Sequence, residues 1–157
     1  PMLKTNAMRA LDKAGIHYTP YFYEPDETDL SGIHVAAQIG LPQEFLFKTL
    51  VARGDKHGLL VFCIPVNLEL DLKKCAAAAK DKRVELLPVK ELLPLTGYLR
   101  GGCSPIGMKK AFPTWFDESA ELYDEIVISA GIRGCQLQLN RAQLLQFVGA
   151  SLGDLTA

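Results

Sequence analysis

The chain has 157 residues, of which 48% are hydrophobic and 22% charged, with a formal net charge of -1. This length is typical of one domain, which we expect over residues 1–157, and the composition is too apolar for a disordered chain. The longest apolar run, at 59–66, is too short for a membrane span of about 20 residues. The near-neutral charge also argues against a broad nucleic-acid surface.

The first half of the chain predicts alternating helices and strands. Asn6 is placed to cap a helix that Gly15 ends, and the residues at 17–24 favour a strand. Ser31 then begins a helix through Ile39. The apolar stretches at 45–53 and 59–66 flank the polar sequence RGDKHG, which predicts an antiparallel hairpin.

The second half continues this mixture. Asp71 is placed to cap a helix through Lys80, and Asn140 to cap the last one. Between them we expect strands at 84–87, 125–130 and 135–139 and a short helix at 89–95. Helices mixed with hairpins predict an α+β fold, with a mixed and largely antiparallel sheet that curls into a barrel-like core flanked by helices.

The four cysteines are widely separated, and neither a CxxC pair nor a zinc-like Cys/His spacing occurs. Cys63, Cys75 and Cys135 are therefore interpreted as small, reduced core residues. We expect no metal and no other cofactor. The N-terminal residues lack the continuous apolar segment of a secretory signal, which favours the cytosol.

Lys48 is the most unusual charge in the sequence. In a strand it shares one face with Leu46 and Leu50, while Phe47 and Val51 point to the other face. Because burial of an unpaired ammonium is costly, Lys48 either extends its side chain to solvent or projects into a polar cavity that receives an anion or carbonyl.

The segment TGYLRGGCSPIGMKK, at 96–110, is rich in glycine and poor in catalytic side chains. Gly101, Gly102 and Gly107 allow another molecule to approach the backbone, and Pro105 stiffens the turn. Backbone amides exposed in this way can bind a carbonyl oxygen, an oxyanion or a phosphate. A tight turn without any ligand is the alternative interpretation.

A hydrolase with its own nucleophile would need a serine or cysteine beside a base. Cys103 and Ser104 lie in the glycine-rich segment, but no base can be assigned to them from the sequence. The three histidines, His17, His34 and His57, lie in surroundings typical of exposed residues.

Five segments together resemble the YbaK family, the bacterial Cys-tRNA(Pro) deacylases, which are related to an editing domain of some prolyl-tRNA synthetases. These segments are FKTLV at 47–51, LDLKK at 70–74, TGYLRGGCSPIGMKK at 96–110, PTWFD at 113–117 and VISAGIRG at 127–134. Their order and spacing carry the resemblance, which covers nearly the whole chain.

The resemblance implies an enzyme that hydrolyses cysteine mischarged on proline tRNA. Lys48 matches the family's essential lysine, which anchors the 3'-terminal part of the substrate. Residues 101–105 match its GxxxP element, whose backbone faces the aminoacyl ester, so the implied catalytic set is Lys48, Gly101, Gly102 and Ser104. Pro105 lies with them in the substrate site.

The remaining implied substrate contacts are Tyr23, Ser129 and three further residues. Two of the three differ from the family pattern, and the third lies at a position that varies in the family. Leu30 replaces a phenylalanine, Gln136 replaces an acidic residue, and Cys103 occupies a variable position, where we interpret it as a small residue and not a nucleophile. In the family the thiol of the substrate cysteine attacks the ester and forms a cyclic thiolactone, so the enzyme needs no nucleophile of its own.

The departures at Leu30 and Gln136 leave two alternatives open: a deacylase for Ala or Ser, and a non-catalytic module that binds tRNA ends or nucleotides. Lys109 and Lys110 are candidate phosphate contacts for the acceptor end of tRNA. The family resemblance implies prolyl-tRNA synthetase as a partner that supplies tRNA identity.

Overall fold

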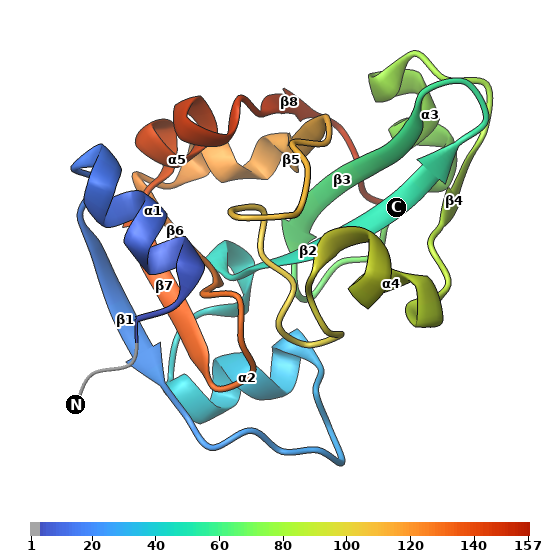
Figure 1. The fold of residues 1–157 in the computed structure, drawn as a ribbon. Coiled ribbons are helices and arrows are strands. Elements are labelled where there is room, and N and C mark those ends of the chain that lie inside the picture. The colour runs from blue at the N-terminus through green and yellow to red at the C-terminus, as the bar shows by residue number, and fades with distance from the viewer. Residues whose placement is uncertain (1–3) are drawn as a thin grey trace.

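The structure is a computed structural model that describes residues 4–157. It contains two β-sheets with helices around them (Figure 1). The smaller sheet has the strand order β1-β7-β6, and the larger has the order β4-β2-β3-β5-β8. No helix of the described residues is both long and apolar enough to cross a membrane.

The smaller sheet is antiparallel and consists of β1 (Tyr18–Phe22), β7 (Cys135–Asn140) and β6 (Glu125–Ser129). Its neighbouring helices are α1 (Asn6–Ala14) and α5 (Arg141–Val148). The predicted cap of α1 is wrong by one residue, because Thr5 Oγ1 accepts the hydrogen bond from Met8 N. Asn140 caps α5 as predicted.

The larger sheet contains β4 (Val84–Leu86), β2 (Phe47–Gly54), β3 (Gly58–Pro65), β5 (Thr114–Asp117) and β8 (Ser151–Gly153). The hairpin of β2 and β3 confirms the most regular prediction, with Gly54 paired to Gly58 at its tip. β5 and β8 add two parallel pairings that the sequence analysis did not predict.

An isolated parallel bridge between Leu46 and Val127 joins the two sheets. The remaining helices are α2 (Gly32–Ile39), α3 (Leu72–Ala79), α4 (Val89–Thr96) and the 3-10 helices η1 (Gln43–Phe45) and η2 (Glu118–Leu122). This arrangement confirms a mixed α+β fold. The strand pairings of the described residues leave both sheets open at their edges, so the predicted barrel-like closure is not confirmed.

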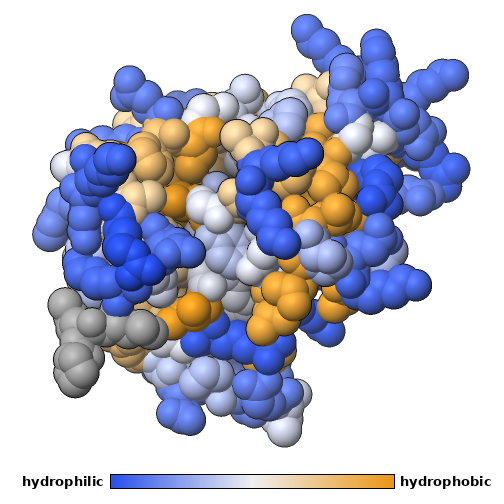
Figure 2. Space-filling view, viewed as in Figure 1, coloured by the Kyte–Doolittle hydropathy of each residue, from blue (hydrophilic) through white to orange (hydrophobic). Residues whose placement is uncertain are grey.

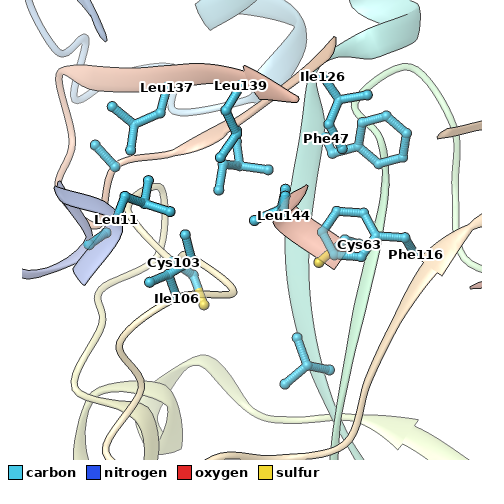
Figure 3. Close-up of a cluster of buried hydrophobic side chains, with 14 of the residues drawn as sticks. Leu11, Phe47, Cys63, Cys103, Ile106, Phe116, Ile126, Leu137, Leu139 and Leu144 are labelled. Atoms are coloured by element: carbon cyan, nitrogen blue, oxygen red, sulfur yellow. The ribbon is translucent and has the colours of Figure 1, made fainter. Parts of the chain in front are cut away.

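The main core lies between the two sheets. Phe47 and Phe116 of the larger sheet meet Ile126 and Leu137 of the smaller one in a single buried cluster (Figure 3). Cys103, from the glycine-rich segment, joins this cluster. The segment is therefore anchored in the core on one side, which fixes the position of its backbone.

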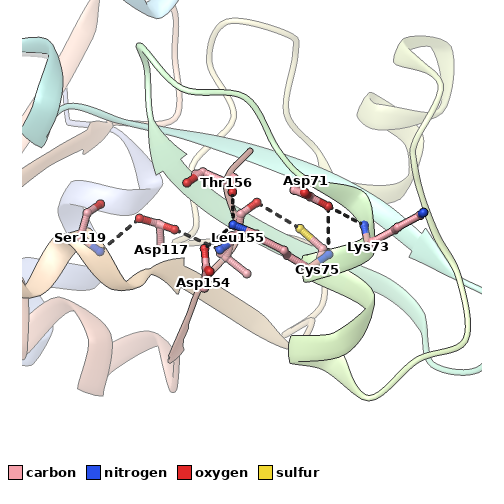
Figure 4. A network of polar contacts seen from close by, with 9 residues as sticks. Asp71, Lys73, Cys75, Asp117, Ser119, Asp154, Leu155 and Thr156 are labelled. Atoms are coloured by element: carbon pink, nitrogen blue, oxygen red, sulfur yellow. Dashed lines mark hydrogen bonds and ion pairs between the residues drawn. The ribbon is translucent and has the colours of Figure 1, made fainter.

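The C-terminal segment is held across α3 and β5 by a small polar network (Figure 4). Asp117 accepts hydrogen bonds from the backbone N–H of Ser119 and of Leu155, at 3.1 Å each. Leu155 O accepts one from Asp71 N at 2.8 Å, and Asp71 also caps α3 as predicted. Asp117 and Asp71 thus connect the chain end to the larger sheet.

Candidate functional site

A cavity of about 450 Å³ lies between β2, the start of α2, the region of β4 and α4, and the segment that follows α4. Its lining includes six of the residues that the sequence analysis singled out: Leu30, Lys48, Gly101, Cys103, Ser129 and Gln136. These residues come from five separate stretches of the chain. The fold therefore brings the predicted lysine and the predicted glycine-rich segment to one cavity.

Lys48 lies in the strand β2 and reaches this cavity with a side chain that is 27% exposed. The carboxylate Oε1 of Glu69 lies 3.8 Å from its Nζ, and the Glu69 side chain is itself largely exposed. Such an exposed ion pair is weak. The Lys48 side chain thus lines the cavity, as the second of the two alternatives for Lys48 requires, and the binding of an anion or carbonyl there stays a prediction.

The bridge between the sheets explains why Lys48 lies beside polar residues of the smaller sheet. Leu46 pairs with Val127 in parallel, so the strand β6 continues from there to Ser129 alongside the segment of β2 that carries Lys48. Ser129 in turn pairs with Gln136 on β7. One long-range bridge therefore brings Lys48, Ser129 and Gln136 together.

The glycine-rich segment begins with a tight turn. Gly102 N donates a hydrogen bond to Leu99 O at 3.0 Å, and Gly101 has a φ of 86°. A positive φ at the third position is typical of a type II turn and favours glycine. The Gly102 amide is consequently engaged within the turn, so the prediction of a free donor at Gly102 is corrected.

The backbone amides on either side of Gly102 are not engaged in the turn in the way that the Gly102 amide is. Gly101 and Cys103 both line the cavity, and the hydrogen bonds of the described residues include none donated by their backbone N–H groups. Gly102 itself packs closely on the following loop, since a Cβ there would lie 3.1 Å from Arg133 N and from Ile132 C. Only glycine allows this approach without a backbone shift.

Tyr98 holds the rest of the segment in place. Its hydroxyl donates a hydrogen bond to Ile106 O, and a Cβ at Gly107 would lie 2.9 Å from that hydroxyl oxygen. Burial raises the pKa of Tyr98 to about 12, so the hydroxyl keeps its proton as a donor at neutral pH. The sequence analysis did not single out Tyr98, although it lies within the glycine-rich segment.

Neither side-chain nucleophile of the segment is activated. Burial raises the pKa of the Cys103 thiol to about 12, and a thiol is a poor nucleophile. Ser104 is fully buried, and its Oγ accepts a hydrogen bond from Ile106 N at 3.3 Å. Ser104 does not line the cavity, and neither do the three histidines.

The innermost polar pair is Ser129 and Gln136. Ser129 Oγ accepts a hydrogen bond from Gly131 N at 3.1 Å. Gln136 is 5% exposed, and its Oε1 is buried without a hydrogen-bond partner in the described chain. A buried carbonyl oxygen left unpaired is unfavourable, so this atom indicates an acceptor kept for a ligand.

Four other predicted residues lie outside the cavity lining: Tyr23, Pro105, Lys109 and Lys110. Tyr23 follows β1, and its backbone N–H donates to Gly134 O at 3.0 Å. Lys109 donates from Nζ to Pro94 O at 3.1 Å and so stabilises the end of α4. The cation that does line the cavity beside the glycine turn is Arg100, which the sequence analysis missed.

Within residues 4–157, no group of three or more His, Cys, Asp or Glu side chains is placed to hold a metal ion. The four cysteines of the chain are buried and free, and three of them are the predicted core residues Cys63, Cys75 and Cys135. The polar side chains that line the cavity are those of two cations, Lys48 and Arg100, one carboxylate, Glu69, the hydroxyl residues Ser31, Thr49 and Ser129, and the amide of Gln136.

A comparison with known families matches residues 31–147 to the aminoacyl-tRNA editing domain. The match includes the part of the chain from α2 to α5 and every cavity-lining residue except Leu30. The chain belongs to the aminoacyl-tRNA editing domain family. Within this family it is a YbaK-type protein, as the sequence motifs implied.

Individual relatives agree with this placement. A protein of Enterococcus faecalis (strain ATCC 700802 / V583), named "Putative Cys-tRNA(Pro)/Cys-tRNA(Cys) deacylase EbsC", is 46% identical over 153 residues, which cover 98% of this chain and 93% of that protein. A crystal structure of "a putative trans-editing enzyme for prolyl tRNA synthetase" has a TM-score of 0.82 and 25% identity, and the match covers 99% of each chain.

A further solved structure, of a hypothetical protein, shares the fold with a TM-score of 0.85. Its identity is 20%, and the match covers 95% of this chain and 97% of that one.

Proposed function

We propose that this protein is a deacylase that removes cysteine mischarged on proline tRNA. The observation that carries the proposal is the single cavity that contains Lys48, the Gly101 turn and the unpaired oxygen of Gln136. Membership of the editing family and the 46% identity to a protein named as a Cys-tRNA(Pro)/Cys-tRNA(Cys) deacylase support the substrate class.

In this proposal the nucleophile is the thiol of the substrate cysteine. The sulfur attacks the ester carbonyl, the bond from the carbonyl carbon to the ribose oxygen breaks, and the thiol proton leaves with the ribose hydroxyl. The product is tRNA(Pro) and a cyclic thiolactone, which water then opens to cysteine. The unactivated state of Cys103 and the burial of Ser104 agree with a reaction that uses no protein nucleophile.

The cavity supplies hydrogen-bond donors and holds the substrate in position for attack. The amides of Gly101 and Cys103, which donate to no group in the described chain, are assigned to the oxyanion that forms during attack. Lys48 is assigned to the phosphate of the terminal nucleotide, which displaces the weak contact to Glu69. Positioning alone can supply a large part of the acceleration when the attacking group is already tethered.

The α-ammonium of the substrate is assigned to Gln136, because its Oε1 is the buried acceptor without a partner. Leu30 and Ser129 form the wall beside it. Tyr23, Pro105 and Ser104 are given no direct contact in this mechanism, since they do not line the cavity.

For the tRNA body we propose contact only near the acceptor end. The net charge of -1 offers little general attraction for a polyanion. Lys109 and Lys110 are exposed near this segment and keep their assignment as outer phosphate contacts. We further propose that prolyl-tRNA synthetase supplies tRNA identity and that the protein acts in the cytosol.

The proposed function is tested by comparing three esters of one tRNA. Purified protein is incubated with tRNA(Pro) charged with cysteine, alanine or serine, and release of each amino acid is followed over time. We expect cysteine to be released on the order of 100-fold faster than alanine, which has no side-chain nucleophile. Faster release of alanine or serine would make the protein a different deacylase, and no release from any ester would make it a binding module.

A further inference from the structure

The cavity has a second, apolar end beyond Lys48. Its lining follows β2 from Leu46 to Val51, a length of about 17 Å at the usual rise of a strand. Near the start of β2, the strand β6 runs parallel from Val127, the partner of Leu46, to Ser129 beside Lys48, and Ser129 pairs with Gln136. At the other end Leu87 N donates to Val51 O at 3.0 Å, which brings β4 and α4 to the cavity.

The side chains at this second end are aliphatic, and several face solvent. The lining residues there are Leu50, Val51, Leu86, Leu87, Val89 and Leu92. Leu86 is 49% exposed and Val89 is 61% exposed. Figure 2 shows hydrophobic side chains gathered over the region of β2 and α4, with hydrophilic side chains bordering them. Exposed apolar groups that continue a cavity are typical of a binding surface.

We propose that this apolar end binds the base of the nucleotide that carries the aminoacyl ester. The inference rests on the proposed function and adds a subsite to it. In an aminoacylated nucleotide the ribose carries the ester, the phosphate and the base on different atoms. With the aminoacyl group at Gln136 and the phosphate at Lys48, the base extends along β2 towards Leu86 and Val89.

Charge and chemistry favour a nucleotide base over an apolar protein segment. Two cations, Lys48 and Arg100, line the same cavity, which suits a ligand that joins an apolar face to a phosphate. The six aliphatic residues of the second end offer no side-chain donor or acceptor. The base is therefore held by burial of its face against aliphatic side chains, which tolerates any base, and not by recognition of its edge.

The first test compares Leu86→Ala, Val89→Ala and the double variant with wild type on Cys-tRNA(Pro). Both residues are exposed, so their truncation removes little from the core. We expect KM to rise about 10-fold in the double variant with kcat almost unchanged, since a base packed on these aliphatic side chains contributes binding in both ground and transition states. The matched control is Leu122→Ala, at a leucine that is 77% exposed on η2 and outside the cavity.

The second test needs no turnover. Binding of adenosine 5'-monophosphate and of ribose 5-phosphate is measured by calorimetry with wild type and the double variant. We expect the nucleotide to bind about 10-fold more tightly than the sugar phosphate to wild type, because its base buries apolar area, and the difference to disappear in the double variant.

Equal binding of the two ligands by wild type, or an unchanged KM in the double variant, overturns the base subsite. A double variant that loses affinity for prolyl-tRNA synthetase but keeps the preference for the nucleotide also overturns it, and indicates a protein-docking surface. If wild type hydrolyses no ester, the proposed function fails, while the comparison of the two ligands still decides the subsite.

Discussion

At the scale of single residues, the proposed mechanism assigns substrate contacts to Lys48, one of two cations that line the cavity, and to the neutral amide of Gln136. Within residues 4–157, the one carboxylate paired with Lys48 Nζ, at 3.8 Å, belongs to the exposed Glu69. Gln136 presents a buried oxygen without a partner and carries no charge. A substrate that brings a phosphate and an ammonium therefore finds one partner for each.

Replacement of Lys48 tests the role of the cation. We expect Lys48→Ala to lower kcat/KM for Cys-tRNA(Pro) about 10- to 100-fold, because a hydrogen bond to a charged group contributes about 1.5–3 kcal/mol. Lys48→Arg, which keeps the charge, should retain part of the activity. Steady-state deacylation kinetics give both values.

The control for this series is Lys73→Ala, at an exposed lysine of α3 that does not line the cavity. Its kinetics should match those of wild type. If Lys48→Ala behaves as Lys73→Ala does, the cation has no part in the reaction.

The sequence predicted the importance of Lys48 because an ammonium in an otherwise apolar strand needs a special environment. It also singled out Gln136, through the family resemblance. It could not distinguish Gly101 from Gly102 as a donor, since the engagement of the Gly102 amide with Leu99 O depends on the turn geometry. It missed Arg100 because an exposed arginine beside a glycine turn has no distinguishing pattern.

At the scale of elements, the glycine-rich segment is held from three sides. Cys103 is anchored in the core, Tyr98 binds Ile106 O, and Gly102 packs on the backbone of Ile132 and Arg133. The backbone of Gly101 and Cys103, two residues that line the cavity, is thus fixed before a ligand arrives. Fixed donors cost no reorganisation during the reaction, which is why such a segment can stabilise an oxyanion.

A pair of glycine variants separates this role from general stability. Gly101 and Gly149 have φ values of 86° and 66°, so alanine at either position is strained by roughly 1–2 kcal/mol. We expect Gly101→Ala and Gly149→Ala to lose similar free energy of unfolding in urea denaturation. Only Gly101→Ala should lower kcat/KM, because Gly149 ends α5 outside the cavity. Equal activity of the two variants would remove the turn from the mechanism.

The predicted helices and the β2–β3 hairpin could be read from caps, periodicity and glycine turns, because these signals are local. β5 and β8 were not predicted. Each has only three or four residues, and each pairs in parallel with a distant segment, as Cys63 does with Phe116. Their existence depends on tertiary contacts that no local pattern encodes.

At the scale of the whole molecule, two open sheets share one core, and the cavity lies where they meet. This junction is a single bridge, from Leu46 to Val127. The sequence predicted the class of fold, but the hydrophobic pattern of the strands is compatible with one closed barrel or with two joined sheets. The strand pairings decide between them, because the edge strands of the two sheets do not pair with each other within residues 4–157.

The buried core predicts a loss of stability in alkali. Burial raises the pKa of all four thiols, to about 12 for Cys75 and about 11 for Cys135, and raises that of Tyr98 to about 12. Below pH about 9 these groups are protonated in both the folded and the unfolded chain, so they contribute their full share to the free energy of unfolding. Above it the unfolded chain releases protons that the folded chain keeps, and stability falls until the folded pKa values are reached.

Urea denaturation at pH 8, 9 and 10 measures this effect. The expected slope approaches about 1.4 kcal/mol per thiol for each pH unit above the unfolded pKa. The variant Cys75→Ala should show a smaller slope than wild type, because one of the four thiols is absent. A free energy of unfolding that stays constant from pH 8 to 10 would contradict the burial of these groups.

The proposed mechanism requires that the bound aminoacyl group supplies the attacking atom. Its most direct test is the single-turnover deacylation rate of tRNA(Pro) charged with cysteine or with S-methylcysteine, with binding of the latter verified by competition. Methylation removes the nucleophile but keeps the ester, so we expect a rate lower by on the order of 100-fold or more. Equal rates for the two esters would contradict it and would require water or a protein group as the nucleophile.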